Sequence, residues 1–344
     1  MEGSFFKPME SLMQNFKKLT VFGIAEGTKL DLETIEQAMQ AQAFVPGGAQ
    51  AERSTGWAAP REEAHAPFIE AIAGHWLATY VIETRSVPKE VVEKKLVAWI
   101  EAFEHECGRA PGRKEQRQMR ADVLTSLMPN ALTRTEKIAV WIDPTAKTVG
   151  IAATAQTKTD SVVTGLVRAI EDFAVVHRTD QGMIVAAMRE WLMLDHDEAM
   201  PSDITLGNEC VLKALDESQA VANFTKQAVS CDEVRQSLKA GKMPLRLELV
   251  FGKHLSLVLC ANGALKKIRF EDAFLMNKHD HQKGDLDGGF TIFATEMAKT
   301  LSDLQAAIQL TIDNVKLSQD ASIRAMQGIA GMWQHKEAPA AVLA

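Results

Sequence analysis

The stretch "HLSLVLCANGALKKIRF" (254–270) contains two short apolar runs separated by Asn262-Gly263. Asn-Gly tolerates the positive φ angles that a tight hairpin turn requires. The sequence therefore predicts two antiparallel strands that meet at this dipeptide.

The preceding segment, "MPLRLELVF" (243–251), alternates between apolar and polar residues and predicts a third strand. The alternation assigns one face of this strand to leucines and the other face to charged residues. The leucines are Leu245, Leu247 and Leu249, and the charged residues are Arg246 and Glu248.

Further elements follow from periodicity and from Pro and Gly positions. Strands are expected over 17–24, 75–85, 137–143, 148–154 and 204–212, and helices over 30–44, 159–173, 183–194, 231–240 and 292–315. The Gly- and Pro-containing segment 45–60 is expected to be a loop. Because no regular βαβ alternation appears, we predict an α+β fold with antiparallel sheets.

An all-helical arm is expected over residues 88–130. Pro88 opens its first helix, "GRAPG" (108–112) breaks it, and a second helix over 113–128 ends at Pro129. The apolar face of the first helix contains Val92, Leu96, Trp99, Ile100 and Phe103.

The second helix of this arm concentrates positive charge, although the 344-residue chain has a net charge of −7. Arg113, Arg117 and Arg120 recur at i, i+4 and i+7 and share one helix face. Such a row can contact successive phosphates without reading bases. A solvated surface helix is the alternative interpretation of this row. Lys266, Lys267 and Arg269 form a second basic group. The alternative there is an exposed strand edge that its lysines protect from aggregation.

Composition excludes several classes of protein. No apolar stretch approaches the length of a membrane span, and no secretory signal begins the chain, so a cytoplasmic protein is expected. The four cysteines form no CxxC pair and predict reduced thiols. No aromatic residue for base stacking lies among the basic residues between Phe103 and Trp141. No sequence-reading module is found either, which favours contact with the duplex backbone.

Catalytic signals are weak: no GxSxG, P-loop or helix-opening GxGxxG occurs. The segment "NKHDHQKGD" (277–285) resembles a run of metal ligands, with His279, Asp280, His281 and Asp285, and suggests a metal-dependent hydrolase as one alternative. We favour a polar loop there and predict no catalytic residue, metal or cofactor. A DNA-independent protein-interaction scaffold using the apolar end of the arm is the second alternative.

Several segments occur together in the order and spacing of the recombination-associated RdgC family, which the chain resembles over roughly residues 16–312. They are "FKKLTVFGI" (16–24), "AFVPGGAQAERSTGW" (43–57), "ADVLTSLMPNALTRTEKIAVWID" (121–143), "LKAGKMPLRLELVF" (238–251), "ANGALKKIRFED" (261–272) and "GGFTIFATEMAKTL" (288–301).

The resemblance implies a non-enzymatic, nucleoid-associated protein that binds double-stranded DNA with little sequence preference and restrains RecA-type recombinase. It implies a horseshoe-shaped subunit and a homodimeric ring around DNA, with no membrane. The implied parts are a central α+β domain (15–86 and 135–182), a helical tip arm (87–134), a base α+β domain (183–334) and loose termini (1–14 and 335–344).

The resemblance also implies site residues. Lys226 and Gln227 match family positions for DNA contact, and Arg113, Lys114, Arg117 and Arg120 stand in for the family's basic tip helix. Asn130 replaces an Arg of some members, so Arg134 could supply that contact. Leu132 replaces an aromatic in the tip-to-tip contact, and the expected dimer interface contains Leu124, Leu127, Met128 and Leu132.

Overall fold

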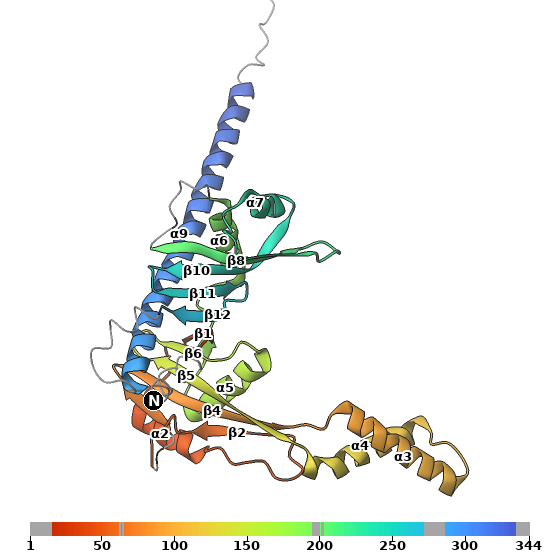
Figure 1. The fold of residues 1–344 in the computed structure, drawn as a ribbon. Helices are drawn as coiled ribbons and strands as arrows, with labels where there is room; N and C mark the ends of the chain where they lie inside the picture. The colour runs from red at the N-terminus through yellow and green to blue at the C-terminus, as the bar shows by residue number, and fades with distance from the viewer. Residues whose placement is uncertain are drawn as a thin grey trace, which may run out of the picture. The chain divides into compact units, whose positions relative to one another are not determined.

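The protein is described here from a computed structural model that covers residues 16–61, 63, 65–194, 200, 203–271 and 286–334, with side chains of the last helix described for 287–317. The chain divides into two compact units. The first comprises Gln14–Val176, and the second begins at His177. The described secondary structure is mixed α/β with antiparallel sheets (Figure 1).

The first unit is built on antiparallel strands in the order β2-β4-β5-β6-β1, with β3 paired to β4 and β7 paired to β1. Their bounds are β1 Lys18–Ile24, β2 Arg53–Ala58, β3 Ile69–Ile72, β4 His75–Arg85, β5 Thr133–Asp143, β6 Thr148–Ile151 and β7 Val175–Val176. Helix α2 (Leu32–Ala41) and helix α5 (Gln156–Ala169) belong to the same unit. Asp31 caps α2 by accepting a hydrogen bond from the Thr34 backbone N–H at 2.9 Å.

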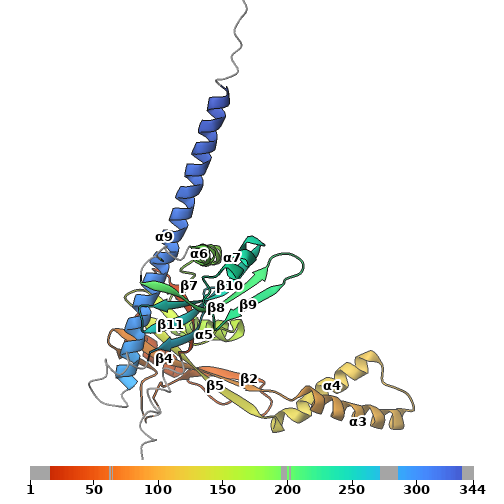
Figure 2. The same cartoon turned by 45° about the horizontal axis from the view of Figure 1, so that its top comes forward.

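Strands β4 and β5 carry the predicted helical arm. Their antiparallel register runs from Trp76 opposite Ile142 to Arg85 opposite Thr133. Between the two strands lie α3 (Lys89–Cys107), α4 (Arg113–Leu127) and the 3₁₀ helix η1 (Met128–Asn130). Figures 1 and 2 show α3 and α4 side by side beyond the ends of β4 and β5. The prediction of two helices here is confirmed.

The arm has its own small hydrophobic core. Val92 and Leu96 of α3 pack with Val123 of α4, and all three are buried. Partly buried side chains surround them, namely Val87, Trp99, Ile100, Met119, Leu124 and Leu127. Burying these apolar side chains is the main term that holds the two helices together.

The second unit has antiparallel strands in the order β12-β11-β10-β8-β9. Their bounds are β8 Ile204–Ala214, β9 Val221–Thr225, β10 Lys242–Phe251, β11 Leu255–Cys260 and β12 Leu265–Phe270. The helices of this unit are α6 (Gln181–Met193), α7 (Asp232–Lys239) and α9 (Leu286–Gln334). Trp191 of α6 donates a hydrogen bond to the Thr311 hydroxyl of α9 at 2.9 Å, which fixes these two helices together.

The hairpin at Asn262-Gly263 is confirmed. Strands β11 and β12 pair antiparallel, and Gly263 adopts a φ of 77°. A residue with a Cβ is strained at this angle, which explains why glycine stands at the turn.

The face assigned to Leu245 is wrong. Leu247 and Leu249 are buried as expected, but Leu245 is 37% exposed. The register of β10 against β8 shifts between Pro244 and Arg246, so Leu245 is an extra residue on β10. The bulge reverses the alternation on its N-terminal side, and Pro244, which cannot donate to the sheet, accompanies it.

The segment 45–60 is not a continuous loop, because β2 occupies Arg53–Ala58 and pairs with β4. Gly56, expected in the loop, lies in this strand where the backbone of Phe44 comes close to it. A Cβ on Gly56 would lie 2.6 Å from the Cα of Phe44, where the chain crosses the strand. A glycine inside a strand often marks such an approach.

The helices that differ most from their expected bounds are α5 and α9. Helix α5 begins at Gln156 and ends at Ala169, three to four residues before the expected 159–173. Helix α9 begins at Leu286 and continues to Gln334, well beyond the expected 292–315. Among the described residues, none of the helices combines the length and hydropathy needed to cross a membrane.

We predict that Gly56→Ala lowers the free energy of unfolding by about 1–3 kcal/mol, because the added methyl group must displace backbone rather than a flexible side chain. Gly48→Ala is the matched control, since its Cβ would meet no atom within 4 Å. Urea titration monitored by tryptophan fluorescence measures both. Equal stability of the two variants would contradict the close approach at Gly56.

Candidate nucleic-acid interface

The predicted basic row lies on α4 and is exposed. Arg113, Lys114, Arg117 and Arg120 all have exposed side chains on this helix. The side of α4 facing α3 is occupied by Val123 and its apolar neighbours. The four basic residues lie mainly on the turns of α4 that precede Val123, and their side chains are accessible to solvent.

Two of the predicted phosphate contacts already have acidic partners. Arg120 of α4 forms an ion pair with Glu93 of α3, and both side chains are half-exposed. Arg134 of β5 lies 2.9 Å from the Glu136 carboxylate. A hydrogen bond from Lys158, together with smaller contributions that include the charge of Arg134, lowers the pKa of Glu136. Among the described residues, no ion pair is found for Arg113, Lys114 or Arg117.

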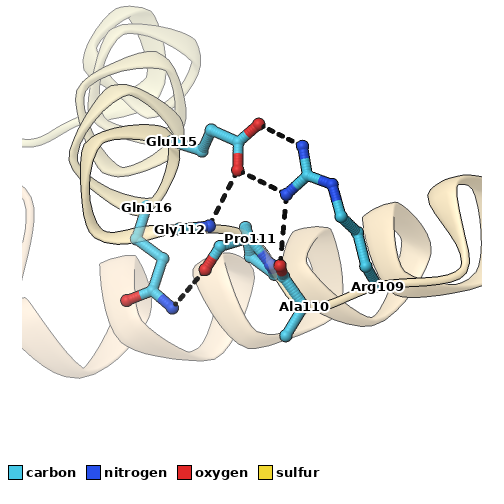
Figure 3. A network of polar contacts seen from close by, with 6 residues as sticks. All are labelled: Arg109, Ala110, Pro111, Gly112, Glu115 and Gln116. Carbon is cyan, nitrogen blue, oxygen red and sulfur yellow. Dashed lines mark hydrogen bonds and ion pairs between the residues drawn. The ribbon is translucent and has the colours of Figure 1, made fainter.

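Arg109 lies between α3 and α4 and closes the turn that joins them (Figure 3). Its guanidinium donates to both carboxylate oxygens of Glu115, at 2.7 and 2.8 Å. The same carboxylate accepts from the Gly112 backbone N–H at 2.7 Å, which caps the start of α4. Gly108 ends α3 in the left-handed region, with a φ of 66°.

The Arg109 hydrogen bonds, followed by the Gly112 N–H, lower the pKa of Glu115 from 4.5 to about 2. Conversely, the Glu115 carboxylate raises the pKa of Arg109. Glu115 is thus ionised at neutral pH and balances Arg109. The net positive charge of α4 then comes from the residues that follow the turn.

The residues expected at the dimer interface fall into two groups. Met128 is buried, and Leu124 and Leu127 pack against the core of the arm. These three residues stabilise the arm itself. Leu132 is different, because it is 87% exposed beside the start of β5.

Lys226 and Gln227 follow β9 in the second unit and are both exposed. Lys226 has a φ of 59°, which places its backbone in the left-handed region just after the strand. The pair therefore occupies a sharp turn rather than the strand.

The second sheet places Arg246 on the same face as two members of the basic group that the sequence indicated at 266–269. Arg246 lies opposite Cys260, Lys266 opposite Val258, and Arg269 opposite Ser256. Because alternate residues of a strand share a face, these three basic residues lie on one side of the sheet. Glu248 is also on β10, and Glu209 forms an ion pair with Lys267. The strand register is the signal that would have found this group.

Thiol and metal chemistry find little support in the described parts of the chain. Burial raises the pKa of the Cys210 thiol to about 12, and burial also raises that of Cys260. Within the described ranges, no cluster of three His, Cys, Asp or Glu side chains could hold a metal ion. The segment 277–285, with His279, Asp280, His281 and Asp285, lies outside the described residues.

Comparison with known proteins decides the family. Residues 15–311 match the family described as "Putative exonuclease, RdgC". The chain belongs to the RdgC family. The resemblance noted from ordered segments is thereby confirmed, and the match covers the arm and all described strands of both units.

Individual RdgC relatives are similar over most of their length. The recombination-associated protein RdgC of Aeromonas hydrophila is 28% identical over 297 residues, covering 85% of this chain and 97% of the relative. Those of Dechloromonas aromatica and Cupriavidus necator are 26% and 29% identical, with the same coverage. Residues after 311 lie beyond the family match.

We predict that the Arg109–Glu115 contact makes the turn pH-sensitive only in acid. The folded-state pKa of Glu115 lies below its ordinary value, so its stabilising contribution is complete above about pH 4.5 and disappears as the pH falls toward 2. Amide hydrogen exchange over 112–116 should be faster in Glu115→Gln than in the unchanged chain at neutral pH.

This difference should shrink as the pH falls toward 2 and vanish below it, because Glu115 is then protonated. Glu101→Gln, an exposed position on α3, is the control and should leave exchange at the turn unchanged. Identical exchange in Glu115→Gln and the unchanged chain at pH 7 would contradict the capping role.

Proposed function

We propose that this chain binds double-stranded DNA without sequence preference, through phosphate contacts made by exposed basic side chains. Arg113, Lys114 and Arg117 of α4 are the principal contacts. Lys226 and Gln227 contribute from the second unit, and Arg120 and Arg134 contribute when their acidic partners release them.

The observation that carries this proposal is the exposed cationic row on α4 within an acidic chain. Arg113 and Arg117 are one helical turn apart, and Lys114 lies beside them. Glu115 is the nearest acid and is already engaged by Arg109. Displacing counterions from DNA requires such a local positive surface, whatever the net charge of the protein.

The chemistry of the row favours phosphate over bases. Base stacking on single strands would require aromatic side chains among the cations. Phe103 contacts Arg109 within the arm, and the described cation–π pair of Lys95 and Trp99 belongs to α3. The residues of α4 itself include none that is aromatic. Duplex backbone is therefore the substrate that fits.

We further propose a role in recombination, as the names of the relatives indicate for those proteins. In this proposal two horseshoe-shaped subunits form a homodimeric ring around DNA, associate with the nucleoid and restrain RecA-type recombinase. The arm (87–134) is the tip and residues 183–334 form the base. Leu132, exposed where the arm joins β5, makes the contact between the two arms.

We propose that the protein is not an enzyme, although the description of the family mentions an exonuclease. The 277–285 segment holds the residues that a metal-dependent hydrolase would use. Loss of labelled duplex that requires a divalent cation, and that is abolished by Asp280→Asn with Asp285→Asn, would favour the hydrolase over the binding protein.

We predict that Arg113→Ala, Lys114→Ala and Arg117→Ala together weaken duplex binding and flatten its salt dependence. Each lost phosphate contact should reduce the slope of log affinity against log salt by about 0.9. Fluorescence anisotropy with two unrelated duplexes, between about 50 and 200 mM salt, measures the slope. Loss of affinity with an unchanged slope would exclude phosphate contact by these residues.

Arg120→Ala is the matched control on the same helix. Because Glu93 already engages Arg120, this substitution should change the slope less than Arg117→Ala. Conversely, Glu93→Gln should release Arg120 and steepen the slope. Equal effects of Arg117→Ala and Arg120→Ala would show that the ion pair with Glu93 does not keep Arg120 from contacting phosphates.

We predict that the ring makes binding depend on DNA ends. The unchanged chain should bind linear duplex more tightly than closed circular duplex of the same sequence. Leu132→Asp should remove the difference by opening the tip contact, whereas Leu215→Asp, 79% exposed in the second unit, should not. Equal binding of linear and circular DNA by the unchanged chain would contradict a closed ring.

A further inference from the structure

A second group of cations lies in the first unit, where α5 meets the sheet that carries the arm. Its members come from four different elements, β1, β2, β5 and α5. We call these residues the basal patch: Lys18, Arg53, Arg134 and Lys158. The first three are exposed, and the side chain of Lys158 is 32% exposed.

The two arginines of the patch share one face of the sheet. Arg53 of β2 lies opposite Thr84 of β4. Thr84 in turn lies opposite Arg134 of β5. Because residues directly opposite each other on neighbouring strands project to the same side, Arg53 and Arg134 form a row across three strands.

Helix α5 lies against the same face. Arg53 donates a hydrogen bond to the Ser161 hydroxyl of α5. One turn earlier on this helix, Lys158 donates a hydrogen bond to the Glu136 carboxylate of β5. Alternate residues of a strand share a face, so Glu136 lies on the side of Arg134. The arginines and Lys158 therefore surround one region of the surface.

Glu136 is the carboxylate that the patch shares. It accepts the hydrogen bond from Lys158 and lies 2.9 Å from the Arg134 guanidinium. The hydrogen bond from Lys158 is the main cause that lowers the pKa of this carboxyl group. The charges of Lys158, Arg134 and Lys18 lower it further. Glu136 is therefore ionised at neutral pH and interacts with three of the four cations.

One carboxylate does not balance four cations. In the described part of the chain, Glu136 is the acid that forms ion pairs with the patch, and none is found for Arg53. The Ser161 hydroxyl that holds Arg53 is neutral. The exposed Asp160 lies between Lys158 and Ser161 on α5. Even when Asp160 is counted, the cations outnumber the acids, and the patch is positive.

The spread of the patch favours an extended polyanion over a small phosphate. Two strand spacings of about 4.8 Å separate the backbones of Arg53 and Arg134, roughly 10 Å in all. A single phosphate group does not satisfy both cations, whereas successive phosphates of a nucleic-acid backbone can do so. Arg134 also stands at the start of β5, where the arm returns to the sheet. The patch therefore continues the basic surface of the arm onto the sheet.

We propose that the basal patch is a second contact site for the duplex backbone, in which phosphate replaces Glu136 as the partner of Arg134 and Lys158. This role rests on the proposed function, the binding of duplex through α4, and extends the contact to the sheet. Ion pairs near the protein surface are weak, so phosphate can take over these two cations. Glu136 limits affinity, because it occupies the cations in the free chain and repels phosphate in the complex.

Fluorescence anisotropy of the full chain with duplex DNA, at several salt concentrations, tests the contacts. Arg134→Gln with Lys158→Gln should weaken binding and reduce the slope of log affinity against log salt by about 0.9 for each lost phosphate contact. Lys29→Gln with Arg168→Gln is the matched control. It removes the same two types of charge at the other end of α5, where Lys29 pairs with Glu171, and should leave the slope unchanged.

Glu136→Gln tests the role of the shared carboxylate. The amide has nearly the same size and keeps an oxygen that accepts from Lys158, so the fold should be retained. Duplex affinity should rise at least about threefold. Glu171→Gln makes the same change in net charge and should leave affinity nearly unchanged. Roughly 20 Å of helix, more than a Debye length, separates it from the patch.

Two results would overturn the basal patch while duplex binding through α4 stands. One is a salt slope that is the same in the chain with Arg134→Gln and Lys158→Gln as in its control. The other is a Glu136→Gln chain that binds duplex no more tightly than the Glu171→Gln chain. Absence of any duplex binding by the unchanged chain would instead overturn the proposed function and this site with it.

Discussion

The antiparallel pairing of β4 with β5 is the constraint on which the candidate interface depends. Because Arg85 lies opposite Thr133, the inserted segment must leave and re-enter the sheet at neighbouring positions. Two helices of similar length joined by a short turn satisfy this requirement. The buried strand residues below, including Leu77 opposite Trp141, hold the base of the insertion in place.

The next constraint is the packing of the arm and the contacts of its charged side chains. Val123 of α4 packs with Val92 and Leu96 of α3, whereas Arg113 and Arg117, on the turns of α4 before this contact, stay exposed. Glu115 turns back to hold Arg109 and cap the helix, which removes this acid from the row that follows. The same small core thus stabilises the helical hairpin on which Arg113 and Arg117 are exposed.

Local signals predicted much of this structure, and tertiary contacts decided the rest. Asn262-Gly263 requires one turn geometry, so its hairpin was readable from the sequence. Gly56 and Leu245 were misread, because their roles arise from the Phe44 crossing and from a bulge against β8. Likewise, the basic row was visible by helical spacing, but nothing local indicated that Glu93 of α3 would engage Arg120.

The account predicts that duplex DNA contacts α4 through its backbone. Amide hydrogen exchange of the full chain, with and without saturating duplex of two unrelated sequences, tests this most directly. Protection of residues 113–120 that is the same for both sequences, and that is lost at high salt, is the expected result. Saturation of the chain by duplex without protection of α4 would contradict it.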